Sequence, residues 1–116
     1  MDERRQLPRW EIKKDIKVWI PMTQGFGHCV LEDMHLKGMC VSFDKPMPVE
    51  KLSRISFELK NEFIKIEATV PWKRENSGRY FYGLSFTQIA DLDKEKIYQF
   101  INTSCYDQFK DKWWSQ

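Results

Sequence analysis

A long hydrophobic run is the first thing that the sequence lacks. No apolar stretch exceeds a few residues, whereas a membrane-spanning helix needs about 20. Four of the first five residues, Asp2, Glu3, Arg4 and Arg5, are charged at the place where a secretory signal leads into its apolar core. We therefore expect a soluble protein that does not insert into membranes, with the cytoplasm as its default location.

Cysteine is also scarce. The three cysteines, Cys29, Cys40 and Cys105, are odd in number and have apolar neighbours, which is typical of reduced core residues rather than of a disulfide framework. They favour a reducing compartment. A metal site made of His28, Cys29, His35 and Cys40 would need spacings that zinc motifs do not show, and adjacent residues of a strand point to opposite faces.

An excess of positive charge is missing as well. Nineteen Lys and Arg residues are nearly balanced by seventeen Asp and Glu residues, which leaves a net charge of +2. Binding to a nucleic acid polymer usually needs a basic stripe on a more positive domain. The composition therefore disfavours a nucleic acid partner, and any anion would have to be held by a local group of cations.

Short alternating segments dominate what the chain does contain. With 116 residues, 41% of them hydrophobic, it is long enough for one domain with a core. Period-two alternation and short apolar runs predict strands. These strands are expected at 15–20, 29–31, 39–43, 52–59, 63–70 and 80–86. Pro71 limits ladder pairing, which predicts an edge or a bulge near Trp72.

The pattern becomes helical from Asp91. An acidic start is followed by apolar residues at three- to five-residue spacing, which predicts one amphipathic helix. The expected apolar stripe consists of Leu92, Ile97, Phe100, Ile101 and Cys105, and the helix is expected to continue towards Trp113. Together these elements predict a mainly β fold, a small antiparallel barrel or sandwich plugged or flanked by the helix.

Three segments follow from this division. Residues 1–13 form a basic N-terminal arm, residues 14–104 form the β domain with its closing helix, and residues 105–116 form a C-terminal extension. The extension carries Phe109, Trp113 and Trp114 among charges. It either packs under the barrel or presents an apolar anchor to a partner or a second copy.

The arm contains the densest cluster of positive charge. Arg4-Arg5-Gln6-Leu7-Pro8-Arg9 places three guanidinium groups within six residues. Guanidinium forks bind phosphate oxygens or guanine edges in pairs and also stack on flat rings. Taken alone, such an arm is more often a solvated tail than a site.

Two separated motifs resemble those of the PilZ domain family. Glu3-Arg4-Arg5-Gln6-Leu7-Pro8-Arg9 is similar to the Arg-x-x-x-Arg motif that opens these domains, and Asp33-Met34-His35-Leu36-Lys37-Gly38 is similar to their Asp/Asn-x-Ser-x-x-Gly motif. The resemblance continues through Val70-Pro71-Trp72, the strand at 82–86 and the closing helix. It covers roughly residues 3–104.

The resemblance implies a six-stranded antiparallel β-barrel with a C-terminal helix that binds cyclic di-GMP as its ligand and needs no cofactor. Arg5 and Arg9 would contact phosphates and guanine edges, and Arg4 would add a further contact. Asp33 would accept the two adjacent donors of guanine, because an ionised carboxylate offers only acceptors. Gly38 would let the ligand lie against the backbone.

His35 departs from the family motif. It stands where most PilZ domains have a small serine, and an imidazole is larger and changes charge near pH 6.5. The intact arginines, Asp33 and Gly38 nevertheless favour binding. We expect His35 to be turned outward or to contact the ligand.

These observations predict a cytoplasmic bacterial cyclic di-GMP receptor or adaptor, not an enzyme, because no nucleophile with a convincing base is present. The arm would close over the ligand and change a surface for a protein effector that controls motility, biofilm formation or polysaccharide secretion. The protein would be a monomer or a weak dimer. One alternative is a PilZ-like interaction module that binds no nucleotide. Another is a stacking platform for single-stranded nucleic acid. That platform would consist of Trp10, Trp19, Trp72, Tyr80 and Tyr82.

Overall fold

The structure, a computed structural model, describes residues 9–20 and 26–104. Outside these ranges lie Arg4, Arg5, the segment 21–25, Cys105 and the predicted continuation of the helix. Within the described ranges, none of the helices has the length and apolar character needed to span a bilayer.

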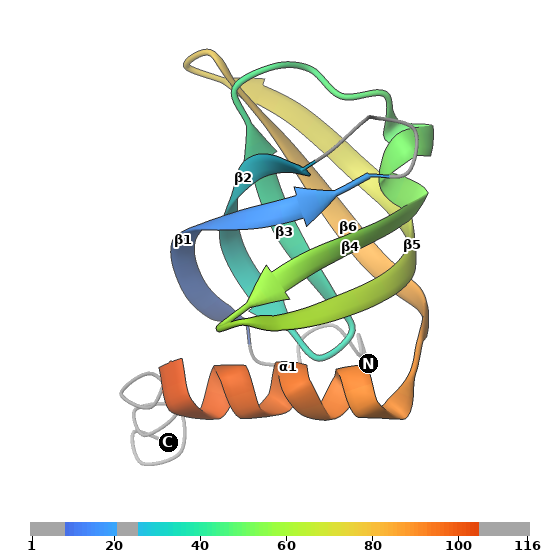
Figure 1. Cartoon of the computed structure of the whole chain (residues 1–116). Helices are drawn as coiled ribbons and strands as arrows, with labels where there is room; N and C mark the ends of the chain where they lie inside the picture. The colour runs from blue at the N-terminus through green and yellow to red at the C-terminus, as the bar shows by residue number, and fades with distance from the viewer. Residues whose placement is uncertain (1–8, 21–25, 105–116) are drawn as a thin grey trace, which may run out of the picture.

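Six antiparallel strands close into a barrel (Figure 1). Around the barrel their order is β1-β2-β3-β6-β5-β4. The strands are β1 (Trp10–Trp19), β2 (Phe26–His35), β3 (Gly38–Phe43), β4 (Arg54–Leu59), β5 (Glu62–Asn76) and β6 (Arg79–Ile89). A short 3-10 helix, η2 (Val49–Ser53), precedes β4, and α1 (Asp91–Ser104) follows β6. The predicted mainly β barrel with a C-terminal helix is confirmed.

Several strands are longer than the sequence pattern predicts. β1 begins at Trp10, so the expected boundary of the arm at residue 13 lies inside the first strand. β2 and β3 are joined by a two-residue turn at Leu36 and Lys37, where a longer connection from Asp33 was expected. β5 extends to Asn76. Its last residues are exposed, so apolar alternation gives no sign of this extension.

The barrel interior is filled by the apolar residues of the alternating pattern. Leu31, Met34, Val41, Phe57 and Ile64 are almost completely buried. Cys29 and Cys40 are buried free thiols; Cys29 belongs to the core cluster, as predicted, whereas Cys40 lies outside that cluster. The hairpin turns at Lys60-Asn61 and Ser77-Gly78 have positive φ angles at both central residues. Such turns match the right-handed twist of the flanking strands.

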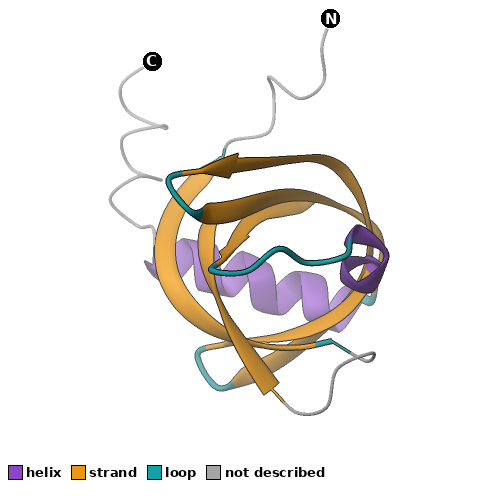
Figure 2. Cartoon of the chain, turned by 90° about the horizontal axis from the view of Figure 1, so that it is seen from above, coloured by secondary structure: helices purple, strands orange, loops and turns teal. Residues whose placement is uncertain are grey.

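Helix α1 lies across one open end of the barrel (Figure 2). Ile97, Phe100 and Ile101 are buried under the strands, whereas Leu92 is 77% exposed. The predicted stripe was therefore wrong at Leu92, because a five-residue step to Ile97 corresponds to about 500° and reaches another face of the helix. Lys96 fixes the helix to the β4–β5 hairpin, with Nζ 3.4 Å from a Glu62 carboxylate oxygen and 3.3 Å from the Phe63 carbonyl.

Candidate functional site

Asp33 faces outward because β2 carries a bulge just before it. Leu31 pairs with Val41 and Asp33 pairs with Cys40, so Glu32 is an extra residue opposite β3. Leu31 and Met34 both point into the core. Simple alternation from Leu31 would have turned Asp33 inward. The bulge therefore places the Glu32 and Asp33 side chains together on the outer face of the barrel.

A row of residues crosses the outer face from Asp33. The strand register places Asp33 opposite Cys40, Cys40 opposite Gly83, and Gly83 opposite Trp72. Residues that face each other across strands share one side of the sheet. Cys40 and Gly83, in the middle of the row, have a small side chain and none. The surface between the Asp33 carboxylate and the Trp72 indole is therefore not covered by large side chains of the row.

The Trp72 indole lies directly on Gly83. A methyl group at Gly83 would collide with indole Nε1, Cε2 and Cδ1, so this close contact needs a glycine. The register shifts between Thr69 and Trp72, which confirms the bulge expected near Pro71. Proline has no N–H to donate to the strand ladder, and a bulge tolerates this because the ladder is already interrupted there.

Arg74 continues this aromatic end of the row. Its guanidinium carbon lies 5.5 Å from the centre of the Trp72 ring and 5.3 Å from that of Phe81. Cations at this distance over an aromatic face are attracted by its quadrupole. Trp72 remains 38% exposed, so a flat ring and a guanidinium are both accessible here.

Gly38 lies where strand β6 approaches too closely for a side chain. A side chain at Gly38 would collide with the carbonyl oxygen of Leu84 on β6 and would lie 3.1 Å from His35 Nε2. Gly38 pairs with Ser85 on β6 and with His35 on β2. A second row of residues therefore runs beside the first, and Gly38 lies in it.

The His35 ring folds back over Gly38. Its Nδ1 accepts a hydrogen bond from the backbone N–H of Lys37 at 3.1 Å. Burial lowers the pKa of His35, and the nearby cations Arg9 and Lys37 lower it further. The imidazole is therefore neutral near pH 7 and covers the glycine that the motif analysis assigned to the ligand.

Arg9 approaches Asp33 at the start of β1. Arg9 Nε lies 3.7 Å from Asp33 Oδ1, and the two side chains are 62% and 24% exposed. Burial raises the pKa of Asp33, while Arg9 acts against this shift. The structure thus brings Arg9, Asp33, His35 and Gly38 to one surface. Arg4 and Arg5 lie outside the described residues.

The cysteines, the possible metal ligands and the aromatic residues considered for nucleic acid lie in surroundings of other kinds. Burial raises the pKa of Cys29 and of Cys40 to about 12, so both thiols stay protonated at neutral pH. Among the described residues, no group of three His, Cys, Asp or Glu side chains is arranged to hold a metal ion. Trp10 and Tyr82 are buried and cannot serve as a stacking platform.

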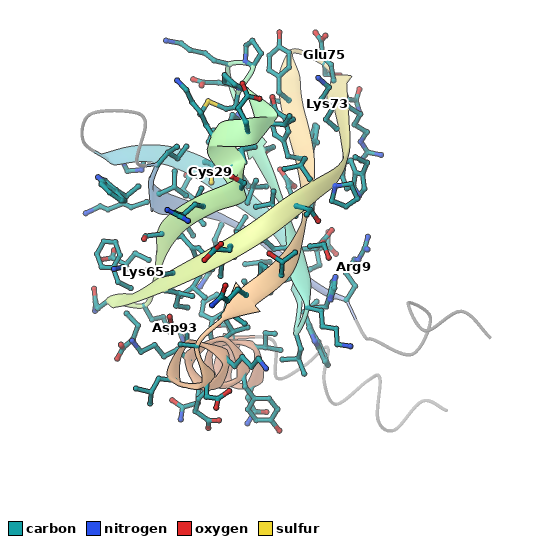
Figure 3. All side chains as sticks on the ribbon, turned by 90° about the vertical axis from the view of Figure 1, so that its right-hand side faces the viewer. Arg9, Cys29, Lys65, Lys73, Glu75 and Asp93 are labelled. Atoms are coloured by element: carbon teal, nitrogen blue, oxygen red, sulfur yellow. The ribbon has the colours of Figure 1, made fainter. Side chains whose placement is uncertain are left out.

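A groove of about 330 Å³ lies on another part of the barrel. Trp19, Ser56 and Lys65 line it from β1, β4 and β5, and Asp93 of α1 borders it. Figure 3 shows Arg9 and Lys65 projecting on opposite sides of the barrel. The groove is therefore distinct from the surface around Asp33.

The lowered pKa of His35 predicts an acid-dependent loss of stability. The unfolded state binds a proton near pH 6.5 and the folded state only at lower pH, so the free energy of unfolding falls as the pH drops below about 6.5. His35→Asn keeps an acceptor for the Lys37 N–H but does not titrate. We expect urea unfolding of the wild type to lose stability relative to this variant between pH 7 and 5; parallel pH profiles would contradict the shift.

Comparisons with known proteins agree with the barrel fold. A scan against protein-family models matches the PilZ domain over residues 3–103. No curated protein matches the sequence. Among solved structures, the Bacillus subtilis inhibitor of motility MotI/DgrA superposes with a TM-score of 0.66 at 19% identity, covering 94% of this chain and 53% of that one.

Two structures from Escherichia coli are also similar. YcgR in complex with c-di-GMP gives a TM-score of 0.65 at 14% identity, covering 94% of this chain and 49% of YcgR. The isolated PilZ domain of YcgR with c-di-GMP gives 0.63 at 14% identity, covering 94% of this chain and 96% of that domain. The chain thus spans about half the length of MotI/DgrA and YcgR. Because the family match covers residues 3–103, the chain belongs to the PilZ domain family.

Proposed function

We propose that the protein is a cyclic di-GMP receptor that binds its ligand on the outer face of the barrel. The observation that carries this proposal is the convergence of Arg9, Asp33 and Gly38 on one surface. Membership of the PilZ family and the c-di-GMP-bound structures of similar fold support it. We propose binding by fixed polar groups, without catalysis or a cofactor.

The chemistry of the surface suits a cyclic dinucleotide. In the receptor, Asp33 accepts the N1–H and exocyclic N–H of a guanine, since its ionised carboxylate is an acceptor on both oxygens. Arg9 contacts a phosphate or the Hoogsteen edge of a guanine with its planar fork. The backbone at Gly38 has no side chain and lets the ligand approach, once the His35 ring either moves away or bonds to the ligand.

In the proposed site, Trp72 supplies an aromatic contact to the ligand that the sequence motifs did not include. It ends the row that starts at Asp33, and the small residues Cys40 and Gly83 lie between them. In the receptor, one base stacks on the exposed Trp72 ring while Arg74 contacts a phosphate. The sequence did identify Trp72 as a candidate stacking residue, but for nucleic acid.

Signalling then depends on a protein partner. In this proposal Arg4 and Arg5 close over the bound ligand and change a surface that an effector recognises in the cytoplasm. The structurally similar MotI/DgrA is an inhibitor of motility, which supports motility among the controlled processes. Biofilm formation and polysaccharide secretion follow from the family resemblance. The proposed receptor is a monomer or a weak dimer.

Calorimetric titration of the full chain tests the proposal. We expect saturable binding of cyclic di-GMP and much weaker binding of cyclic di-AMP, because adenine has no N1–H to donate to Asp33. Heat changes no larger than buffer dilution up to high micromolar cyclic di-GMP would refute the receptor. That result would favour the PilZ-like interaction module that binds no nucleotide.

Trp72→Ala is expected to weaken cyclic di-GMP binding by about tenfold, because one base–aromatic stack contributes roughly 1–3 kcal/mol. Trp19→Ala is a matched control, since Trp19 and Trp72 are both 38% exposed and Trp19 lines the groove on the other side of the barrel. Trp72→Phe should retain most of the affinity. An equal loss in the two alanine variants would show that Trp72 makes no specific contact.

A further inference from the structure

We propose that Glu32 is a positioning residue for ligand binding: its carboxylate, held by Lys13 and Ser42, locks the bulge that turns Asp33 outward. The inference rests on the proposed function, because its consequence is the affinity of Asp33 for a guanine. Glu32 lies outside the two family motifs and immediately precedes Asp33.

The backbone is irregular on both sides of Glu32. Towards β1, the register passes from Glu11–Asp33 to Lys14–Leu31, so Ile12 and Lys13 together face Glu32. Towards β3, Glu32 is itself the extra residue. Lys13 has a φ of 53°, which is uncommon for a residue with a side chain. Two adjacent bulges meet at one glutamate.

The Glu32 carboxylate joins the strands on either side. Lys13 Nζ donates to Oε1 at 3.1 Å, and Ser42 Oγ donates to Oε2 at 2.6 Å. One oxygen thus binds β1 and the other binds β3. Glu32 is only 14% exposed and Ser42 is fully buried, so water competes poorly for these hydrogen bonds.

Arg79 on β6 completes the cluster. Its Nε and Nη2 donate to Ser42 Oγ at 3.1 and 3.0 Å, and Nη2 also donates to the Ser42 carbonyl at 3.0 Å. Because Ser42 Oγ accepts from Arg79, its own proton is directed to Glu32. Burial acts to raise the pKa of Glu32, but the Ser42 and Lys13 hydrogen bonds and the nearby cations outweigh it and lower the pKa. Glu32 is therefore ionised at neutral pH.

The contacts of Glu32 with Lys13 and Ser42 matter because successive side chains of a strand point to opposite faces of the sheet. Slippage by one residue at Glu32 would exchange the faces of Asp33 and Met34, and would carry Asp33 away from Cys40 and Arg9. The cluster opposes this slippage by binding the bulged residue on both sides. Glu32 thus acts on the ligand through Asp33.

The test combines amide hydrogen exchange of the free full chain, followed by NMR, with titration by cyclic di-GMP. In Glu32→Ala we expect exchange at residues 32–34 and 39–41 to accelerate about tenfold, while Ile64 and Ile66 are unchanged. Affinity should fall about tenfold. Glu32→Gln should recover only part of both, because its amide oxygen can still accept from Ser42 whereas its NH2 group cannot accept from Lys13. Glu67→Ala, which removes an exposed ion pair with Arg54, should change neither.

Unchanged local exchange in Glu32→Ala would overturn the lock. Faster exchange with unchanged affinity would overturn the positioning role. Failure of the wild type to bind would instead refute the proposed function, and the exchange rates, which need no ligand, would still decide whether Glu32 holds the bulge. If Glu32→Ala does not fold, Lys13→Met removes one donor from the same carboxylate and should give the same pattern more weakly.

Discussion

Arg9→Ala is expected to weaken cyclic di-GMP binding by tenfold or more. A hydrogen bond to a charged partner contributes about 1.5–3 kcal/mol, and about 1.4 kcal/mol corresponds to a factor of ten in affinity. Arg9 lies 3.7 Å from Asp33 and is 62% exposed, so it can reach a ligand without leaving the carboxylate. Calorimetric titration measures the loss.

Two further variants make this prediction specific. Arg9→Lys keeps the charge but loses the planar fork, so it should restore little affinity. Arg54→Ala removes an arginine that is 74% exposed and pairs with Glu67 at 3.9 Å, and Arg54 lines the groove on the other side of the barrel. Wild-type affinity in Arg9→Ala, or an equal loss in Arg54→Ala, would mean that the site is placed wrongly.

Gly38→Ala is expected to lower the free energy of unfolding by about 3 kcal/mol, near the upper end of typical overpacking costs. The added methyl group would collide with the Leu84 carbonyl oxygen, which is backbone and cannot rotate away. The Gly38–Ser85 pairing of β3 with β6 and the Phe86 N–H to Lys37 carbonyl bond of 2.8 Å would both be strained. Urea denaturation followed by circular dichroism measures the change.

Gly27→Ala is the matched control. Gly27 also lies in a strand, but an added methyl group would approach nothing closer than Val18 Cγ2, at 4.0 Å. Its stability should stay at or slightly above that of the wild type, because alanine reduces the entropy of the unfolded chain. Similar stabilities for the two variants would show that Gly38 makes no tight contact.

Alternation along the chain predicted the strands but left a barrel or a sandwich open, and the resemblance to PilZ domains favoured the six-stranded barrel that the structure shows. Ile55, Phe57 and Leu59 alternate with polar residues and are buried as expected. The sequence pattern failed to predict the full length of strands whose ends consist mostly of exposed residues, because such residues show no apolar alternation. Most residues of β1 between Trp10 and Ile16, and the last residues of β5, are exposed, so the length of these strands depends on pairing with neighbouring strands rather than on local composition.

The residues of the candidate site could be predicted from the sequence only where they belong to motifs. Arg9, Asp33 and Gly38 belong to recognisable motifs, and the structure brings them to one surface. Trp72 joins that surface only through the register between β5 and β6, which depends on a bulge at Pro71. Glu32 gives no local signal, because its proposed role rests on contacts with Lys13 and Ser42 on two other strands.

The position of His35 also needed the structure. The sequence left His35 either turned outward or bonded to ligand; in the structure its ring lies over Gly38 and accepts the Lys37 N–H, and a contact with ligand stays a prediction. This local hydrogen bond is available because the two-residue turn at Leu36 and Lys37 brings the Lys37 N–H back to the His35 ring. Ligand binding near Gly38 therefore requires either displacement of the ring or a direct contact with it.

The most direct test of the proposed site is NMR chemical-shift mapping of the full chain during titration with cyclic di-GMP. We predict the largest shifts at the amides of Arg9, Asp33 and Gly38 and at the indole N–H of Trp72, with little change at Trp19. Shifts confined to the groove around Trp19, or no shifts at saturating concentrations of cyclic di-GMP, would contradict a nucleotide site on this face of the barrel.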